Sequence, residues 1–98
     1  MSALRFWWVR HAPTGRSGAI GWTDAPADFS DAAAFARLSA LLPEPAALVS
    51  SDLSRAKGTA DRVAGTARRR LPDDAALREL HFGDWEGLDF AEAERGWP

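Results

Sequence analysis

Cysteine is absent from this sequence of 98 residues. Its absence excludes disulfide bonds, cysteine-based zinc sites and thiol nucleophiles. Long apolar runs are missing as well, because no stretch approaches the ~20 residues that a membrane-spanning helix needs. The opening residues 1–5 do not have the pattern of a signal peptide. We therefore expect a cytoplasmic protein that has no membrane partner.

A large excess of charge of either sign is also missing. The sequence has 12 Lys and Arg residues against 14 Asp and Glu residues, a net charge of −2. This balance excludes a generally basic protein that binds nucleic acids. With 46% hydrophobic and 27% charged residues, the chain has material for a core and is unlike a disordered segment. The length fits one small domain, or part of one.

Hydrophobic patterning predicts strands that alternate with helices. Residues 4–9 are rich in aromatic residues and strand formers, so they predict a buried first strand that places Trp7 and Trp8 in the core. Residues 12–28 contain many Pro and Gly residues and predict a long loop. The other expected elements are a helix from Ser30 or Asp31 to about Leu42, a strand over 46–50, a helix from Ser51 or Asp52 to about Arg69, a strand over 76–79 and a helix that begins after Asp89. This order predicts an α/β fold with a parallel sheet.

Three segments that follow the expected strands carry candidate chemistry, because ligands of open α/β sheets bind beyond the carboxyl ends of the strands. The first segment is Arg10-His11. A histidine at a strand end can act as a base, a metal ligand or a nucleophile, and an adjacent guanidinium suits a phosphate. The alternative is that both side chains merely meet solvent.

The second segment, residues 50–56, opens a helix. Its backbone N–H groups and the positive end of the helix dipole would face the same crevice. Arg55 lies in the first turn, where a cation opposes the dipole, and this placement makes more sense if an anion binds beside it. The alternative is an ordinary capped helix with one solvated arginine.

The third segment, residues 77–87, gathers carboxylates, a histidine, a tryptophan and two glycines. Glu79, at the end of the expected strand, can serve as a general acid if burial raises its pKa. The alternative is that the aromatic residues of this segment anchor the core and that Asp84 and Glu86 are solvated.

Two further features have simpler interpretations. The three arginines at residues 68–70 are expected to end a helix, where cations favour the helix dipole, rather than to form a nucleic-acid patch. His81 is not expected to bind a metal, because no second ligand stands at a recognisable spacing from it.

Taken together, the segments resemble the motifs of the histidine phosphatase superfamily, also called the phosphoglycerate mutase-like family. Residues 9–14 (Val-Arg-His-Ala-Pro-Thr) resemble its opening Arg-His-Gly motif. Residues 50–60 are similar to its second motif and residues 77–87 to its third. Residues 21–26 (Gly-Trp-Thr-Asp-Ala-Pro) resemble a stretch of its first loop. Four matches in the right order and spacing make the resemblance specific, and they span most of the chain.

The resemblance implies a three-layer α/β/α sandwich and a phosphomonoester hydrolase that acts on a small phosphorylated metabolite. His11 would take the phosphoryl group and become a phosphohistidine. Arg10 and Arg55 would bind the phosphoryl oxygens, whose charge is then held best in the transition state. Glu79 would protonate the leaving alcohol oxygen and then activate water. Neither a metal nor a cofactor is implied, because the guanidinium groups supply the positive charge.

The chain departs from the family pattern in two ways. Ala12 stands where the family has glycine, which requires that this position does not adopt a positive φ. The family's second histidine, in a later Gly-His or Ser-His motif, is not in this chain, since His81 lies in the third motif. Members of the family are commonly much longer, so we expect residues 1–98 to be the N-terminal half of the domain. Residues 4–9 would then be left as an exposed edge.

Residues 82–87 are more similar to the small phosphatase branch of the family, which includes α-ribazole phosphatases, than to the glycolytic mutases. We therefore favour a phosphatase over mutase-type phosphoryl transfer. The alternative from another class is a non-catalytic module that binds phosphorylated ligands through Arg10 and Arg55. The sequence specifies neither the phosphomonoester nor the oligomeric state.

Overall fold

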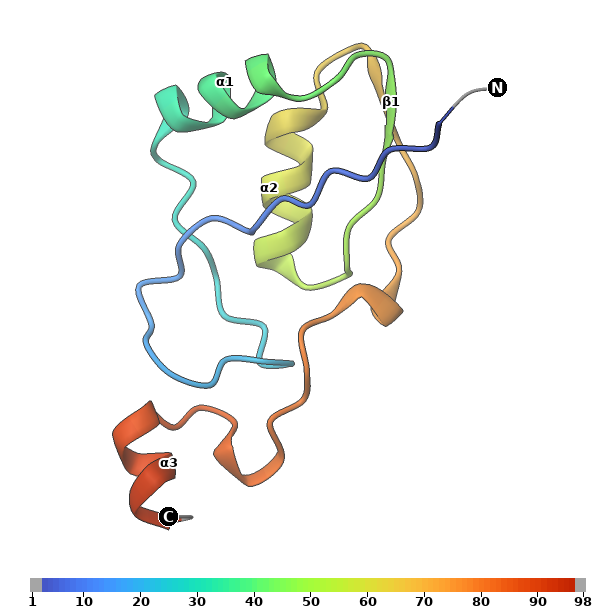
Figure 1. Cartoon of the computed structure of the whole chain (residues 1–98). Coiled ribbons are helices and arrows are strands. Elements are labelled where there is room, and N and C mark those ends of the chain that lie inside the picture. The colour runs from blue at the N-terminus through green and yellow to red at the C-terminus, as the bar shows by residue number, and fades with distance from the viewer. Residues whose placement is uncertain (1–2, 97–98) are drawn as a thin grey trace.

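The computed structural model describes residues 3–96, so the first two residues of the opening segment lie outside it. Figure 1 shows the sheet and the first helices of the chain gathered at one end of the molecule and the last helix at the other. In chain order the elements are α1 (Ala32–Leu41), β1 (Ala46–Leu48), α2 (Ser54–Ala64), β2 (Arg68–Arg70), the short 3-10 helices η1 (Ala75–Leu77) and η2 (Gly83–Trp85), and α3 (Phe90–Gly96).

The two strands form a parallel sheet, and α2 connects them. Ala46 lies opposite Arg68, and Leu48 lies opposite Arg70. The pairing continues beyond the strands, because the Leu71 N–H donates to the carbonyl oxygen of Leu48 at 2.8 Å. This β–α–β unit confirms the α/β fold with a parallel sheet that the order of elements predicts.

Helix α1 begins and ends close to its predicted limits. The Asp31 carboxylate accepts a hydrogen bond from the Ala34 N–H at 3.0 Å, so it satisfies one of the free donors of the first turn. Pro43 and Pro45 follow the helix and prevent its continuation. The helix packs against α2, which in turn packs against β2.

Helix α2 ends earlier than predicted, at Ala64 rather than near Arg69. Gly65 has a φ of +61°, a value that glycine adopts readily and that cannot continue a right-handed helix. The chain then turns into β2, so the prediction that residues 68–70 end a helix is wrong. These arginines form a strand, and only the middle one is fully exposed.

Arg68 is buried in spite of its charge, with 5% of its surface exposed. Its guanidinium forms an ion pair with Glu44 at 3.3 Å. It also donates hydrogen bonds of 2.6–3.0 Å to the carbonyl oxygens of Ser39, Leu42, Pro43 and Val63. The carbonyl groups of Ser39 and Leu42 belong to the C-terminal end of α1, where a positive charge is favourable. Arg68 therefore stabilises the end of a helix, although it does so from a neighbouring strand.

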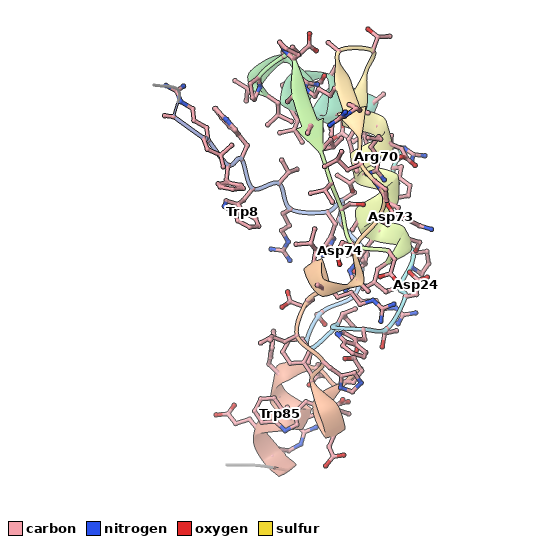
Figure 2. All side chains as sticks on the ribbon, turned by 90° about the vertical axis from the view of Figure 1, so that its right-hand side faces the viewer. Trp8, Asp24, Arg70, Asp73, Asp74 and Trp85 are labelled. Carbon is pink, nitrogen blue, oxygen red and sulfur yellow. The ribbon has the colours of Figure 1, made fainter. Side chains whose placement is uncertain are left out.

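Residues 4–9 do not form the predicted strand. None of their backbone groups bonds to another strand within residues 3–96. Trp7 and Trp8 are 55% and 86% exposed, so the prediction that they lie in the core is wrong. Figure 2 shows Trp8 standing away from the sheet and the helices. A strand needs a hydrogen-bonded neighbour, and residues 4–9 pair with neither of the outer edges that the sheet of β1 and β2 leaves open.

Residues 76–79 do not form a strand either. The Asp74 carboxylate accepts from the Ala76 N–H at 2.9 Å and begins the 3-10 helix η1 instead, as aspartate side chains do when they compete with a strand ladder. The last helix begins where predicted. Asp89 accepts from the Glu92 N–H at 2.6 Å, and Glu92 accepts from the Asp89 N–H at 3.2 Å, which is the reciprocal pair of a capping box.

Candidate active site

A pocket of about 420 Å³ lies where the first and third segments meet. Its lining residues are Arg10, His11, Thr14, Arg16, Gly18, Ile20, Glu79, Phe82 and Phe90. Three of the four residues for which the sequence predicts a catalytic or binding role therefore share one pocket, namely Arg10, His11 and Glu79. The fourth, Arg55, does not line it.

The imidazole of His11 is oriented by the backbone of the next residue. Its Nδ1 lies 2.7 Å from the carbonyl oxygen of Ala12. A carbonyl oxygen only accepts hydrogen bonds, so Nδ1 carries the proton in this arrangement. In the neutral imidazole, Nε2 then keeps a free lone pair. Sequence alone does not assign this tautomer, because the bond depends on the local course of the backbone.

Ala12 is tied to the interior through Thr59. The Ala12 N–H donates to the Thr59 hydroxyl oxygen at 2.8 Å, and that hydroxyl donates to the carbonyl oxygen of Arg55 at 2.8 Å. Ala12 is buried, and no residue other than glycine has a positive φ in the part of the chain that the structure describes. The replacement of glycine at this position is therefore compatible with the backbone. Thr59 belongs to the second motif, but its sequence position did not reveal this link to His11.

Arg55 points to a loop and not into the pocket. Its side chain is buried, with 2% of the residue exposed. The guanidinium donates to the carbonyl oxygens of Thr23 at 2.6 Å, Gly21 at 2.5 Å and Ile20 at 3.4 Å. Since Ile20 itself lines the pocket, Arg55 supports the pocket wall from behind. The alternative of a solvated arginine is wrong.

Glu86 holds the same loop from the other side. Its carboxylate accepts the N–H groups of Gly21, Trp22 and Thr23 at 2.9–3.2 Å and the Thr23 hydroxyl at 2.6 Å. The Phe82 N–H donates to it as well, at 3.3 Å. The interpretation of Glu86 as a solvated residue is therefore wrong. Loop 20–23 is fixed between two side chains. The Glu86 carboxylate accepts hydrogen bonds from its N–H groups, and the Arg55 guanidinium donates hydrogen bonds to its carbonyl oxygens.

The pKa of Glu86 reflects this set of donors. Partial burial raises the pKa, but the hydrogen bonds from the Thr23 hydroxyl and from the N–H groups of Gly21, Thr23 and Phe82 outweigh it and lower the pKa to about 2. The carboxylate is therefore ionised throughout the neutral range.

Asp24 occupies the N-terminus of α2. Its carboxylate accepts from the N–H of Ser54 at 2.7 Å and from the Ser54 hydroxyl at 2.6 Å. These hydrogen bonds lower the pKa of Asp24, and the nearby charge of Arg55 acts in the same direction. The sequence predicts Ser51 or Asp52 as the cap, but the cap comes from the loop, 30 residues before Ser54. Figure 2 marks Asp24 beside this helix.

Glu79 is exposed at the edge of the pocket. One carboxylate oxygen accepts from the Leu80 N–H at 2.9 Å, and the Glu79 carbonyl oxygen accepts from the Trp22 indole N–H at 3.0 Å. The indole also makes an edge contact with His81, with ring centroids 4.9 Å apart. Loop 20–23 therefore positions the backbone of Glu79 through Trp22.

His81 and Asp52 lie outside the pocket lining. Nδ1 of His81 accepts from the Gly83 N–H at 2.9 Å. Asp52 forms a two-point ion pair with Arg78, which lowers the pKa of the aspartate. Within residues 3–96, no group of three or more His, Cys, Asp or Glu side chains is arranged to hold a metal ion. None of the helices in that range is long and apolar enough to cross a membrane.

Several curated proteins are similar to part of this chain. Glucosyl-3-phosphoglycerate phosphatase of Mycolicibacterium vanbaalenii is 38% identical over 55 residues, which are 56% of this chain and 24% of that protein. The same enzyme of Mycobacterium tuberculosis is 40% identical over 55 residues, 25% of its length.

Solved structures match over a longer range. The native structure of a mycobacterial glucosyl-3-phosphoglycerate phosphatase superposes with a TM-score of 0.68 at 32% identity, covering 90% of this chain and 44% of the other. The protein TTHB049 of Thermus thermophilus gives a TM-score of 0.62 at 40% identity, covering 85% of this chain and 48% of the other. The chain thus spans less than half the length of these relatives.

The family model of the histidine phosphatase superfamily (branch 1) matches residues 6–98. This range contains the three motifs, the pocket and every hydrogen bond described above that holds loop 20–23. The fold, the order of the motifs and the family match agree, and the chain belongs to the histidine phosphatase superfamily.

Proposed function

We propose that the chain carries the nucleophile of a phosphomonoester hydrolase that acts through a phosphohistidine at His11 on a small phosphorylated metabolite. The observation that carries the proposal is the bond between His11 Nδ1 and the Ala12 carbonyl oxygen at 2.7 Å. It leaves the lone pair of Nε2 free on a histidine that lines a pocket with Arg10 and Glu79, which supports Nε2 as the nucleophile. Phosphatases among the relatives support hydrolysis as the reaction class.

In the first step, the lone pair of His11 Nε2 attacks phosphorus, and the bond from phosphorus to the alcohol oxygen breaks. Glu79 gives its proton to that oxygen, so the alcohol leaves in neutral form. The guanidinium of Arg10 lies beside His11 in the chain and in the pocket, and it stabilises the charge on the phosphoryl oxygens.

In the second step, water attacks the phosphohistidine. The Glu79 carboxylate takes a proton from this water, the bond between nitrogen and phosphorus breaks, and inorganic phosphate leaves. His11 returns to its starting tautomer because its Nδ1–H donates to the Ala12 carbonyl oxygen throughout, so the proton stays on Nδ1. In this scheme the positive charge comes from guanidinium groups, so no metal takes part.

Arg55 does not line the pocket, so it can contact the phosphoryl group only if its side chain moves. We propose that the Nη1 atom of Arg55 keeps its bond of 2.6 Å to the Thr23 carbonyl oxygen. The Nη2 atom, which donates to the carbonyl oxygens of Gly21 and Ile20, would then turn toward the phosphate.

The test is hydrolysis of a chromogenic phosphate monoester in the presence of a chelator, between about pH 5 and 8, where imidazole titrates. The His11→Ala variant should lose turnover. The His81→Ala variant is a matched control, because it removes the other histidine of the chain, which does not line the pocket. Turnover that survives in His11→Ala would overturn the proposal, and phosphate binding without turnover in the unmodified chain would favour the non-catalytic alternative.

A further inference from the structure

Glu79 has little local structure to hold its backbone. Residues 76–79 form no strand, and the 3-10 helix η1 ends before Glu79, at Leu77. The Glu79 carboxylate accepts from the N–H of the next residue, Leu80, and this bond leaves it attached to its own segment. A general acid is efficient only when its carboxyl group is held in the geometry of the reaction. A contact from another part of the chain must therefore position Glu79.

Trp22 supplies such a contact. Its indole N–H donates to the Glu79 carbonyl oxygen at 3.0 Å, across 57 residues of sequence. The indole also contacts residues on both sides of Glu79. The guanidinium of Arg78 lies over the ring at 5.1 Å from its centroid, within the range of a cation–π interaction. The imidazole of His81 makes an edge contact with it, with ring centroids 4.9 Å apart. One side chain therefore holds the backbone on either side of the general acid.

The backbone of Trp22 is itself held in place. Its N–H donates to the Glu86 carboxylate at 3.2 Å, and the Gly21 N–H donates to the same carboxylate at 2.9 Å. Gly21 lies so close to the Leu80 carbonyl oxygen that a Cβ atom would not fit. Trp22 is 48% exposed and does not line the pocket. It can therefore influence the reaction through Glu79 and not through contact with the substrate.

We propose that Trp22 is a positioning residue for the general acid, because its indole N–H holds the backbone of Glu79 and with it the carboxyl group at the edge of the pocket. This inference rests on the proposed function, in which Glu79 protonates the leaving alcohol. An alkoxide is a strong base and leaves only with a proton, whereas nitrophenolate is a weak base and leaves without one. Trp22 therefore contributes to the hydrolysis of alkyl phosphates and contributes little to that of nitrophenyl phosphate.

The test measures kcat/KM of the full chain for butyl phosphate and for nitrophenyl phosphate. This constant covers the steps up to release of the alcohol and excludes the second step, which both esters share. The Trp22→Phe variant keeps an aromatic ring beside Arg78 and His81 but removes the N–H. We expect it to lower kcat/KM at least about tenfold for butyl phosphate and less than about twofold for nitrophenyl phosphate.

The Trp8→Phe variant is the matched control, because Trp8 is 86% exposed and does not line the pocket. It should change neither constant. The Glu79→Gln background shows whether Trp22 acts through Glu79. With the acid removed, Trp22→Phe should lower kcat/KM for butyl phosphate no further. An equal loss for the two esters, no loss for either, or a loss that persists in full in Glu79→Gln would overturn the proposal.

A second readout does not depend on turnover. By NMR of the isotope-labelled chain, loss of the hydrogen bond should move the carbonyl carbon resonance of Glu79 upfield in Trp22→Phe and leave it unchanged in Trp8→Phe. An unchanged resonance in Trp22→Phe would overturn the proposal. If the unmodified chain hydrolyses neither ester, the proposed function is refuted, and the resonance alone decides whether Trp22 holds the backbone of Glu79.

Discussion

Glu86 and Thr23 are joined by two hydrogen bonds, from the Thr23 hydroxyl at 2.6 Å and from its N–H at 3.1 Å to the same carboxylate oxygen. They connect the third motif to the first loop across 63 residues of sequence. On the opposite side of the loop, the guanidinium of Arg55 binds the loop carbonyls. The wall of the pocket is therefore held by two ionised side chains, each of which bonds to the backbone between them.

We expect the Glu86→Gln variant to be less stable by about 1–3 kcal/mol near neutral pH, with the lower end favoured because the carboxylate is partly accessible to solvent. The pKa of Glu86 is lowered from 4.5 to about 2 in the folded chain. Its contribution to the free energy of unfolding is therefore complete above about pH 4.5 and is lost as the pH falls toward 2. Urea unfolding of the unmodified chain and of Glu86→Gln at several pH values measures this contribution. A variant that keeps the pH dependence of the unmodified chain in that range would contradict the assignment.

Thr59 provides a second test, because it connects the interior to the residue that orients His11. In the Thr59→Val variant the buried N–H of Ala12 loses its acceptor, which costs about 1–3 kcal/mol in the free energy of unfolding. The Thr59→Ser variant keeps the hydroxyl and should retain most of the stability. Thermal unfolding of the pair measures the difference, and equal destabilisation by both substitutions would show that the methyl group and not the hydroxyl matters.

Gly58 lies within α2, and helix propensity alone favours alanine there by roughly 1 kcal/mol. In the structure, the ring of Phe29 lies against Gly58, with Cε2 and Cε1 at 2.7 and 2.9 Å from the place of an added Cβ atom. Arg62 covers that ring as well, 3.9 Å from its centroid. We therefore expect Gly58→Ala to destabilise the chain by about 1–3 kcal/mol, as overpacking does. An increase in melting temperature would mean that Phe29 moves aside freely.

Residues 4–9 are exposed, so a substitution in this segment should have little effect on stability. Trp8 is 86% exposed, so we expect Trp8→Ser to change the free energy of unfolding of the 98-residue chain by no more than about 0.5 kcal/mol. Leu53→Ala is the comparison, since Leu53 is 5% exposed and the loss of a buried leucine costs roughly 2–5 kcal/mol. A large effect of Trp8→Ser would show that the segment packs against the rest of the chain in solution.

We propose that residues 4–9 are covered by further parts of a longer domain, because the relatives extend to more than twice the span matched here. An apolar segment of this size on the surface commonly marks an interaction or leads to association. The 98-residue chain should therefore associate as its concentration rises, and sedimentation should show less association for Trp8→Ser.

The sequence predicted those parts of the fold that depend on local signals. Asp31 and Asp89 begin helices as expected, because an aspartate that bonds to the third residue of a helix needs no distant partner. Arg10, His11 and Glu79 share one pocket, although neither residues 4–9 nor residues 76–79 form the strand from which the prediction started. Residues 4–9 do not form the predicted strand, because strand propensity does not create a neighbour to pair with, but they are exposed, as expected for the N-terminal half of the domain.

The parts that could not be predicted depend on contacts across the chain. Glu86 looked like a solvated carboxylate because its donors lie on two separate segments. Arg68 looked like a residue in the last turn of its own helix, whereas it binds the last carbonyls of another. Arg55 bonds to the carbonyl oxygens of loop 20–23, and its position in the second motif does not indicate these partners. In each case a charged side chain found partners that sequence spacing does not encode.

The most direct test of the central claim is to trap the phosphorylated intermediate. The chain is mixed with a chromogenic phosphate monoester, quenched in base, which preserves phosphohistidine, and analysed by mass spectrometry of its peptides. We expect one phosphate on the peptide that contains His11, retained in His81→Ala and missing from His11→Ala. Phosphate on any other residue, or its persistence in His11→Ala, would contradict the assignment of His11 as the nucleophile.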